Sequence, residues 1–84
     1  MKVSIVTVCL NSEKTIKHSL NSVISQDYKN IEHIIIDGGS TDDTIKILKN
    51  YKFKKKRIYF EKGRSLYDSI NFGIKKCRGD LISI

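Results

Sequence analysis

The sequence predicts an α/β protein in three layers, with helices on both faces of a mainly parallel sheet. Short apolar, β-branched segments alternate with segments whose apolar residues recur at helical spacing, in the order β-α-β-α-β-α-β. The first strand segment, residues 3–10, is almost continuously apolar, as in strands that are covered on both faces. Polar loops follow these strands, at the edge where open α/β sheets bind ligands.

The first strand is expected at residues 3–10, where β-branched residues dominate, and it should end at Asn11 and Ser12. A helix follows, because apolar residues then recur on one side of a helical turn, with Asn11 or Ser12 as its expected N-cap. These apolar residues are Ile16, Leu20, Val23 and Ile24. A polar link at residues 26–30 leads to the second strand, at residues 31–37.

The end of the second strand is the most informative part of the chain. An apolar run, Ile34-Ile35-Ile36, leads to Asp37 and then to the polar loop Gly38-Gly39-Ser40-Thr41-Asp42-Asp43. Glycine adopts backbone angles that a side chain would disfavour, so both glycines are expected to serve the turn. Ser40 or Thr41 is the expected cap of the second helix, with Asp42 and Asp43 in its first turn.

The second half of the chain continues the alternation. The second helix is marked by Thr44, Ile45, Leu48 and Tyr51, and a short third strand is expected at residues 58–60. The third helix is marked by Leu66, Ile70, Ile74 and Cys77, with Gly79 as its C-terminal stop. A fourth strand is expected at residues 81–84. The pattern predicts a single partial domain over residues 1–84, the N-terminal half of a nucleotide-binding α/β domain.

The charge distribution is uneven. Sixteen Lys and Arg against nine Asp and Glu give a formal charge of +7, and seven of the cations lie between Lys46 and Arg57, a window without an acid. Such a cluster suits phosphate, nucleic acid or an anionic membrane. It also suits a solvated helix end followed by a loop. Because no aromatic or glycine-rich RNA-binding pattern accompanies it, no nucleic-acid partner is expected.

Metal binding, secretion and membrane spanning have little support. The two cysteines, Cys9 and Cys77, lie on apolar patterns and indicate buried thiols in a reducing compartment. The single histidines, His18 and His33, lack metal-ligand spacing and are expected to be solvated or hydrogen-bonded. No segment has the length of a membrane span or the features of a signal peptide, so a cytoplasmic location is expected.

Four short motifs together carry a family resemblance. They are residues 3–13, residues 22–26, the segment 36–42 (Ile-Asp-Gly-Gly-Ser-Thr-Asp) and the segment 68–73 (Asp-Ser-Ile-Asn-Phe-Gly). In this order and spacing the sequence resembles the N-terminal part of family-2 glycosyltransferases, most closely bacterial members that build surface polysaccharides. The resemblance implies a truncated GT-A fold, which is Rossmann-like. It also implies an inverting, hexosyltransferase-like enzyme that uses a nucleotide diphosphate sugar.

The resemblance also implies site residues. Thr7, Leu10 and Asn11 would lie at the end of the first strand, around the base and ribose, with Glu13 at the start of the helix. Asp37 would accept a hydrogen bond from the base. Arg64 would reach the base or a phosphate oxygen, while Asp68 and Asn71 would point from the third helix towards the same cleft. Structural alternatives remain open, namely a cap role for Asn11 and a mutual hydrogen bond between Asp68 and Asn71.

Two departures from the family pattern affect these roles. Gly63 stands where the family often has an acid, and Ser65 where it has glycine, which leaves the conformation of the loop around Arg64 open. The family's Asp-x-Asp-like motif, whose carboxylates hold Mn or Mg on the donor diphosphate, would follow Ile84, so no metal ligand and no catalytic base are expected in this chain. The 84 residues alone are therefore expected not to catalyse transfer.

The expected partners are a UDP- or GDP-sugar donor, an acceptor glycan or lipid-linked sugar, and the inner face of the membrane as a peripheral contact. Three alternatives stay open at this point. One is a non-enzymatic polyanion-binding module that uses the basic segment. Another is an inert truncated gene product. The third, a dinucleotide-binding oxidoreductase half, is weakened because no G-x-G-x-x-G follows the first strand.

Overall fold

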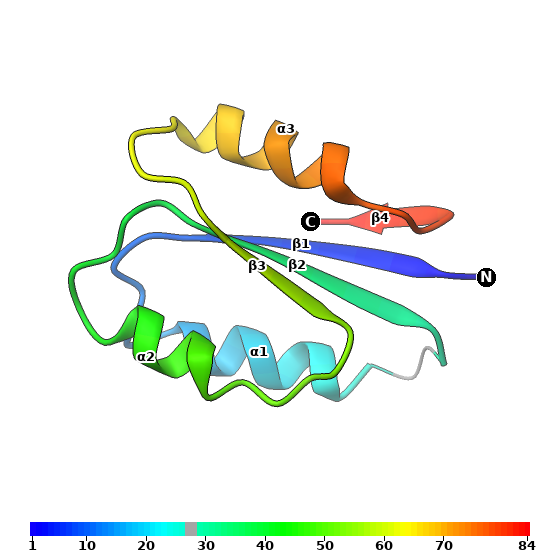
Figure 1. Cartoon of the computed structure of the whole chain (residues 1–84). Coiled ribbons are helices and arrows are strands. Elements are labelled where there is room, and N and C mark those ends of the chain that lie inside the picture. Colours follow the sequence, from blue (N-terminus) through cyan, green and yellow to red (C-terminus); the bar gives the residue numbers. More distant parts are fainter. Residues whose placement is uncertain (27–28) are drawn as a thin grey trace.

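A computed structural model describes residues 1–26 and 29–84 of the chain (Figure 1). The elements are β1 (Val3–Cys9), α1 (Ile16–Ile24), β2 (Ile31–Asp37), α2 (Thr44–Lys49), β3 (Lys56–Phe60), α3 (Leu66–Lys76) and β4 (Leu81–Ser83). The predicted alternation of strands and helices is confirmed, and β2 has the predicted bounds. Of the predicted polar link at 26–30, residues 27 and 28 lie outside the described residues.

The four strands form one sheet in the order β3-β2-β1-β4, and each neighbouring pair is parallel. Helices α1 and α2 cover one face of this sheet and α3 covers the other, so the predicted three-layer architecture is confirmed (Figure 1). In the register, Cys9 pairs with Asp37, and Asp37 with Phe60. Three strands therefore end side by side, at what we call the carboxyl edge of the sheet; the opposite edge is the amino edge.

The core has one layer on each face of the sheet. Under α1 and α2 it consists mainly of Cys9, Ile16, Leu20, Ile35, Leu48 and Tyr51. Under α3 it consists of Val6, Ile34 and Ile36, with Tyr59 and Phe72 packed against them. Helix α3 lies very close to the sheet at Gly73, where an added Cβ would be 2.7 Å from Cγ1 of Val6. The absence of a side chain at Gly73 therefore sets the distance between α3 and β1.

The structure corrects the predicted starts of the first two helices. Helix α1 begins at Ile16 with Thr15 as its N-cap residue, so neither Asn11 nor Ser12 caps it. Helix α2 begins at Thr44 with Asp43 as its N-cap residue, so neither Ser40 nor Thr41 caps it, and Asp42 and Asp43 precede its first turn. The side chains of Asn11, Ser40 and Thr41 instead form hydrogen bonds between loops, as described below, whereas the Ser12 hydroxyl bonds the backbone of Leu10 in its own loop.

Other boundaries differ by a few residues. Tyr51 lies beyond α2 but remains in the core, and β3 begins at Lys56 because its backbone pairs with His33 of β2. Cys77 follows the last helical residue of α3. Ile84 lies beyond β4. Gly79 is not a left-handed stop, since its φ is not positive. Its N–H donates to Ser4 Oγ at 2.8 Å, and its place against β1 leaves no room for a Cβ.

Candidate functional site

Three loops meet at the carboxyl edge. The first loop (residues 10–15) follows β1, the second loop (38–43) follows β2, and the third loop (61–65) follows β3. Parallel strands place all three at the same edge, where α/β proteins bind ligands. Backbone bonds tie the second and third loops to the ends of the neighbouring strands, because Gly38 N–H donates to the Cys9 carbonyl of β1 at 2.9 Å and Glu61 N–H donates to the Asp37 carbonyl of β2 at 2.8 Å.

Asp37 is the centre of the second loop. Its carboxylate is fully buried and accepts backbone N–H bonds from Gly39 at 3.0 Å and Ser40 at 2.9 Å on Oδ2. On Oδ1 it accepts the Ser40 hydroxyl at 2.5 Å and the weaker Cys9 thiol at 3.6 Å. Gly39 has a φ of +101°, which this tight turn requires, whereas Gly38 has no positive φ. The predicted need for two glycines therefore holds only for Gly39.

Asn11 joins the first loop to the second. It is the one non-glycine residue with positive φ, 48°, among residues 1–26 and 29–84. Its N–H donates to Ser40 Oγ at 2.9 Å, and its side-chain Oδ1 accepts from the N–H of Thr41 at 2.8 Å. Because the Ser40 hydroxyl in turn donates to Asp37, one chain of hydrogen bonds runs from Asn11 to Asp37. We call this chain, with the Asn11–Thr41 bond, the loop latch.

Further bonds extend the contact between the same two loops. Ser12 N–H donates to Thr44 Oγ1 at 2.8 Å, and Glu13 N–H donates to Asp42 Oδ2 at 3.2 Å. In return Glu13 Oε2 accepts the N–H of Asp43 at 3.4 Å. Desolvation by itself would raise the pKa of the Asp42 carboxyl, but hydrogen bonds from Thr44 and from the Glu13 N–H lower this pKa. The acids of these two loops therefore serve as hydrogen-bond acceptors that fix backbone.

The third loop positions Arg64. Gly63 has a φ of +89° and open space around it, so glycine suits the turn here, and Ser65 caps α3 by accepting the N–H of Asp68 at 3.1 Å. The guanidinium of Arg64 pairs with Glu61 at 2.9 Å and stacks over the ring of Phe72, 4.5 Å from its centroid. Its side chain remains 38% exposed, which leaves it accessible to a ligand.

Thr7 does not lie at the strand end. Its hydroxyl is 2.7 Å from His33 Nε2 on the α1–α2 face, and His33 Nδ1 is 3.0 Å from the hydroxyl of Tyr51. Burial lowers the pKa of His33 to about 4 and raises the pKa of Tyr51 to about 12. A neutral imidazole accepts at one nitrogen and donates at the other, so it satisfies both neighbours. Sequence reasoning did not link these residues, because the linkage depends on strand register.

The remaining predicted residues are accessible. Leu10 is 56% exposed beside Gly38, and Asp68 is exposed on the first turn of α3. Asn71 is half-buried one turn later, and within the described residues no hydrogen bond joins it to Asp68. The structure thus brings Leu10, Asn11 and Asp37 together with Glu13 close by in the first loop, while Arg64, Asp68 and Asn71 form a second group around the start of α3.

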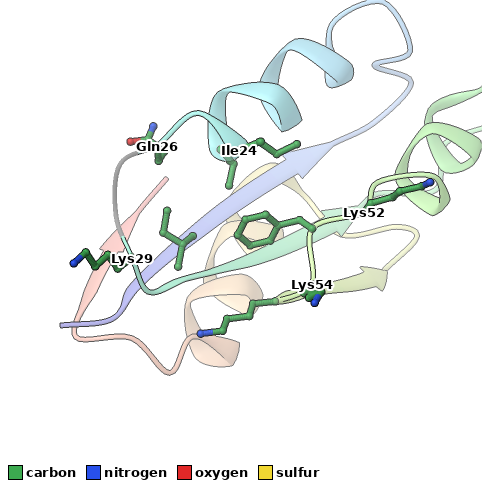
Figure 2. Close-up of a pocket in the computed structure, with 9 residues that line it drawn as sticks. Ile24, Gln26, Lys29, Lys52 and Lys54 are labelled. Carbon is green, nitrogen blue, oxygen red and sulfur yellow. The ribbon is translucent and has the colours of Figure 1, made fainter.

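A shallow hollow of about 260 Å³ opens at the carboxyl edge. Its lining consists of Asp37, Gly39, Ile45, Lys49, Phe60 and Lys62. Phe60 is 49% exposed, so it offers an apolar surface, and the two lysines bring positive charge near the buried carboxylate. Sequence reasoning missed Lys49, Phe60 and Lys62, although Phe60 ends a predicted strand and Lys62 follows it by two residues. A larger hollow of about 470 Å³ lies at the amino edge (Figure 2).

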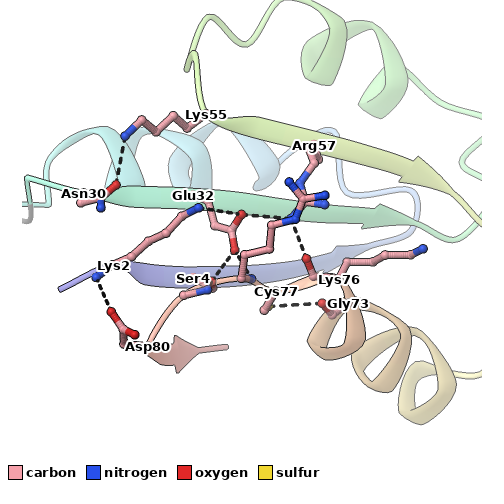
Figure 3. Close-up of polar contacts among 12 residues, drawn as sticks. Lys2, Ser4, Asn30, Glu32, Lys55, Arg57, Gly73, Lys76, Cys77 and Asp80 are labelled. Atoms are coloured by element: carbon pink, nitrogen blue, oxygen red, sulfur yellow. Dashed lines mark hydrogen bonds and ion pairs between the residues drawn. The ribbon is translucent and has the colours of Figure 1, made fainter.

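A second polar cluster surrounds Glu32 near the amino edge (Figure 3). The carboxylate of this nearly buried residue accepts the Ser4 hydroxyl and the N–H of Arg78, and pairs with Arg57 at 3.0 Å and Lys2 at 3.7 Å. Desolvation by itself would raise the pKa of Glu32, but these hydrogen bonds and cations lower this pKa to about 2. Glu32 therefore ties β1, β2 and β3 to the turn before β4.

The described residues do not form a metal site. Across residues 1–26 and 29–84, no three His, Cys, Asp or Glu side chains are grouped as metal ligands. The neighbouring carboxylates of the first and second loops are engaged with backbone N–H groups instead. Nor does the described part of the chain contain a helix long and apolar enough to cross a membrane.

Two sequence relatives are informative. The chain is 36% identical to the putative glycosyltransferase EpsE of Bacillus subtilis, in a match that covers 98% of this chain and 31% of EpsE. It is 37% identical to the poly-beta-1,6-N-acetyl-D-glucosamine synthase of Staphylococcus epidermidis, spanning 88% of itself and 18% of that protein. The chain therefore covers about a third or less of these relatives.

Two solved structures resemble the fold of this chain. The chain matches TarS of S. aureus, solved in complex with UDP-GlcNAc, with a TM-score of 0.83 and 29% identity over 98% of this chain and 25% of that one. It also matches the mannosyltransferase PcManGT of Pyrobaculum calidifontis, in complex with GDP-Man and Mn2+, with a TM-score of 0.87 over 96% of this chain and 26% of that one. At 19% identity the second match concerns the fold alone.

The sequence model of the family described as Glycosyl transferase family 2 matches residues 4–84, almost the whole chain. With the order of strands and helices, the arrangement of loops at the carboxyl edge and the GT-A structural neighbours, this match confirms the family resemblance. The chain belongs to glycosyl transferase family 2.

Proposed function

We propose that this chain supplies the nucleotide-binding part of a glycosyltransferase. In the whole enzyme a UDP- or GDP-sugar would bind at the carboxyl edge. The sugar would pass to a hydroxyl of an acceptor glycan or lipid-linked sugar, in polysaccharide or cell-envelope glycan synthesis. The UDP-GlcNAc bound by TarS, a relative of 29% identity, supports this donor class. The 84 residues alone are proposed to bind without catalysing transfer.

The observation that carries the proposal is the loop latch. It fixes the first and second loops to each other through Asn11, Ser40 and Asp37, and so holds a preformed surface at the carboxyl edge. A preformed surface binds a ligand without first losing the conformational entropy of its loops. Beside it, Lys49 and Lys62 provide cations for a diphosphate.

Asp37 acts in this proposal mainly as a positioning residue. Its oxygens hold the N–H groups of Gly39 and Ser40 and the Ser40 hydroxyl, so removing the carboxylate would release the second loop. A direct hydrogen bond from the base to the Asp37 carboxylate stays a prediction. The proposed donor contacts come from Leu10, Asn11 and Glu13 of the first loop, with Thr7 below them, and from Arg64, Asp68 and Asn71 at the start of α3.

The proposal includes a divalent cation, Mn or Mg, for the whole enzyme. The Mn2+ in the complex of PcManGT fits this expectation. The described residues of this chain show no suitable ligand group, so we assign none of them to the metal. The proposal also includes a cytoplasmic location with peripheral contact at the inner face of the membrane, for which the acid-free basic segment from Lys46 to Arg57 is the support.

A two-dimensional NMR titration of the isotope-labelled chain with UDP and with GDP, with and without Mg2+, tests the binding. We expect shifts at residues 10–13, 37–43 and 61–64. Asp37→Ala should weaken binding about tenfold, through loss of two or more fixed hydrogen bonds. Asp43→Ala is the matched control, because the exposed Asp43 side chain makes no capping bond. Shifts confined to the amino edge, or equal losses in both variants, would contradict the proposal.

A second variant separates positioning from base recognition. In Asp37→Asn the amide oxygen can still accept the two N–H groups, and the Ser40 hydroxyl can rotate to bond the remaining atom. If Asp37 positions the loop, Asn should keep most of the nucleotide affinity that Ala loses. If the charge of Asp37 meets the base, both variants should lose it. A mass-spectrometric transfer assay with UDP- and GDP-sugars checks that the chain alone shows no turnover.

A further inference from the structure

Both ends of the sheet carry charges of both signs, since Lys49 and Lys62 lie at the carboxyl edge and Glu32 and Asp80 lie near the amino edge. At the carboxyl edge, acids such as Glu13 and Asp42 serve as acceptors for loop backbone. At the amino edge the lysines gather, since parallel strands also begin together. Lys2 precedes β1, Lys29 lies two residues before β2, and Lys54 and Lys55 precede β3. The residues of α1 include no acid, and neither does the segment 44–60.

These cations surround an apolar hollow of about 470 Å³ (Figure 2). Lys29, Lys52, Lys54 and Lys55 line it, together with Val23, Ile24, Gln26, Ile31 and Phe53. In Figure 2, Lys29 and Lys52 lie on opposite sides of the hollow, with their amino groups directed away from it. Lysines of this kind can lay their aliphatic stems along an apolar surface while the charge stays at a polar interface.

The apolar surface continues past the hollow. Ile24 and Lys52 also line an adjoining groove of about 420 Å³ between α1 and α2. Its other lining residues are Lys17, Leu20, Asn21, Ile47, Asn50 and Tyr51. Ile24 is 57% exposed and lines both the hollow and the groove, so it adds aliphatic surface where they meet. We call the hollow and groove together the basic amino-edge surface.

We propose that the basic amino-edge surface docks on an anionic phospholipid bilayer. The inference deepens the peripheral membrane contact proposed above by naming the residues that make it, and it does not depend on nucleotide binding. Two features on the same surface, several lysines and an exposed aliphatic side chain, match the phosphate layer and the acyl boundary of such a bilayer. A single-stranded nucleic acid is a poorer match, because nonspecific binding of that kind uses exposed aromatic rings.

The aromatic content of the surface supports this choice. Phe53 is the one aromatic among the described residues that line the hollow. It is half-buried and stacks on the ring of Tyr51, with the centroids 5.9 Å apart and the planes 11° from parallel. One face of this ring is therefore used in packing, which leaves less aromatic surface on which a base could stack. Lys55 is also partly committed, since its Nζ donates to Asn30 Oδ1 at 3.0 Å (Figure 3).

Sedimentation of the 84-residue chain with vesicles tests the proposal. Vesicles of phosphatidylcholine mixed with phosphatidylglycerol should bind it, and vesicles of phosphatidylcholine alone should not. Each lysine near an anionic surface is worth about fivefold in affinity, so the double change Lys52→Gln and Lys54→Gln should weaken binding about 25-fold. Both side chains are exposed, so folding should be unaffected. Added salt should weaken binding of the parent chain.

Two further variants make the test specific. The double change Lys14→Gln and Lys75→Gln removes the same charge from exposed positions outside the surface and should leave vesicle binding nearly unchanged. Ile24→Ser removes aliphatic surface without changing charge and should weaken vesicle binding about fivefold. Equal losses in the two lysine pairs would overturn the proposal. So would binding to poly-uridylate that exceeds vesicle binding and ignores Ile24→Ser, since this result identifies a nucleic-acid surface.

The UDP titration run on the same variants distinguishes this inference from the proposed function. If a variant loses vesicle binding while its UDP shifts at residues 10–13 stay unchanged, the result supports the docking surface and does not bear on the donor site. Absence of UDP shifts with intact vesicle binding would refute the donor site and leave the docking surface in place.

Discussion

Acid should destabilise this fold well before its carboxylates are protonated, because of His33. The ring is fully buried between Thr7 and Tyr51, and burial lowers its pKa from 6.5 to about 4. Between these pH values the unfolded chain binds a proton that the folded chain does not. The free energy of unfolding therefore rises with pH across this window. The stabilisation that comes from the neutral His33 ring is fully present above about pH 6.5 and is lost as the pH falls towards 4.

The size of the effect follows from the pKa change. At about 1.4 kcal/mol per tenfold change in proton affinity, a pKa that moves from 6.5 to about 4 corresponds to about 3 kcal/mol. Small domains are stable by about 5 to 15 kcal/mol, so this is a large fraction. Urea unfolding followed by far-UV circular dichroism, repeated at several pH values between 7 and 4, measures it directly as a shift of the unfolding midpoint.

The chain contains two histidines, which makes the control simple. His18→Gln alters the exposed one and should leave the pH dependence intact. His33→Leu should remove most of the slope, and should cost about 2 kcal/mol at neutral pH, because the hydroxyls of Thr7 and Tyr51 lose their partner. An unchanged slope in His33→Leu, or an NMR titration of His33 with an ordinary pKa, would refute the reasoning.

Three other predictions concern packing and polar contacts. Glu32→Gln should lower the free energy of unfolding by about 2 kcal/mol at neutral pH, because it removes the charge that pairs with Lys2 and Arg57. The loss is smaller than for a fully buried pair, since both cations are partly exposed. Because the pKa of Glu32 is lowered to about 2, the native chain loses stability at this residue as the pH falls below 4.5, and Glu32→Gln should remove this loss. Urea unfolding at neutral pH and below pH 4.5 measures the two effects. Gly73→Ala should destabilise by about 1 to 3 kcal/mol despite the better helix propensity, because the new methyl meets Val6; thermal unfolding would contradict this if the midpoint rose. Asn11→Ala should cost about 1 kcal/mol and broaden the NMR signals of residues 39–41, whereas unchanged signals would mean that the loop latch does not depend on its side chain.

The architecture could be predicted from the sequence because its signals are local. Residues 31–37 contain the apolar run Ile34-Ile35-Ile36, and all seven are buried in β2, so the predicted bounds were correct. The helix starts could not be predicted in the same way. Asn11 and Ser40 have the chemistry of caps, but each bonds to the other's loop about 30 residues away. Asp42 accepts both the distant N–H of Glu13 and the local N–H of Thr44. A contact between residues so far apart in the sequence can be predicted in place of a local cap only once the strand register is known.

The candidate site was predictable to a similar extent. Asp37 stood out because a carboxylate between a buried strand and a glycine turn needs a polar partner, and the structure supplies several within the loop itself. The link between Thr7 and His33 had no local signal, since a lone histidine reveals nothing of its neighbours. Their pairing follows from the register of β1 on β2, in which Thr7 faces Ile35 and the two polar side chains share one face.

The parallel sheet also predicts how the two proposed binding surfaces combine. Strand β2 is seven residues long, so the carboxyl and amino edges are about 20 Å apart, more than twice the Debye length of about 8 Å at physiological salt. Changes at Asp37 and at Lys52 share no contact and should therefore act additively. A chain that carries Asp37→Ala with Lys52→Gln and Lys54→Gln should lose UDP binding as Asp37→Ala does, and vesicle binding as the lysine pair does. A larger combined loss in either assay would mean that the two edges communicate through the sheet, and would require a mechanism other than electrostatics.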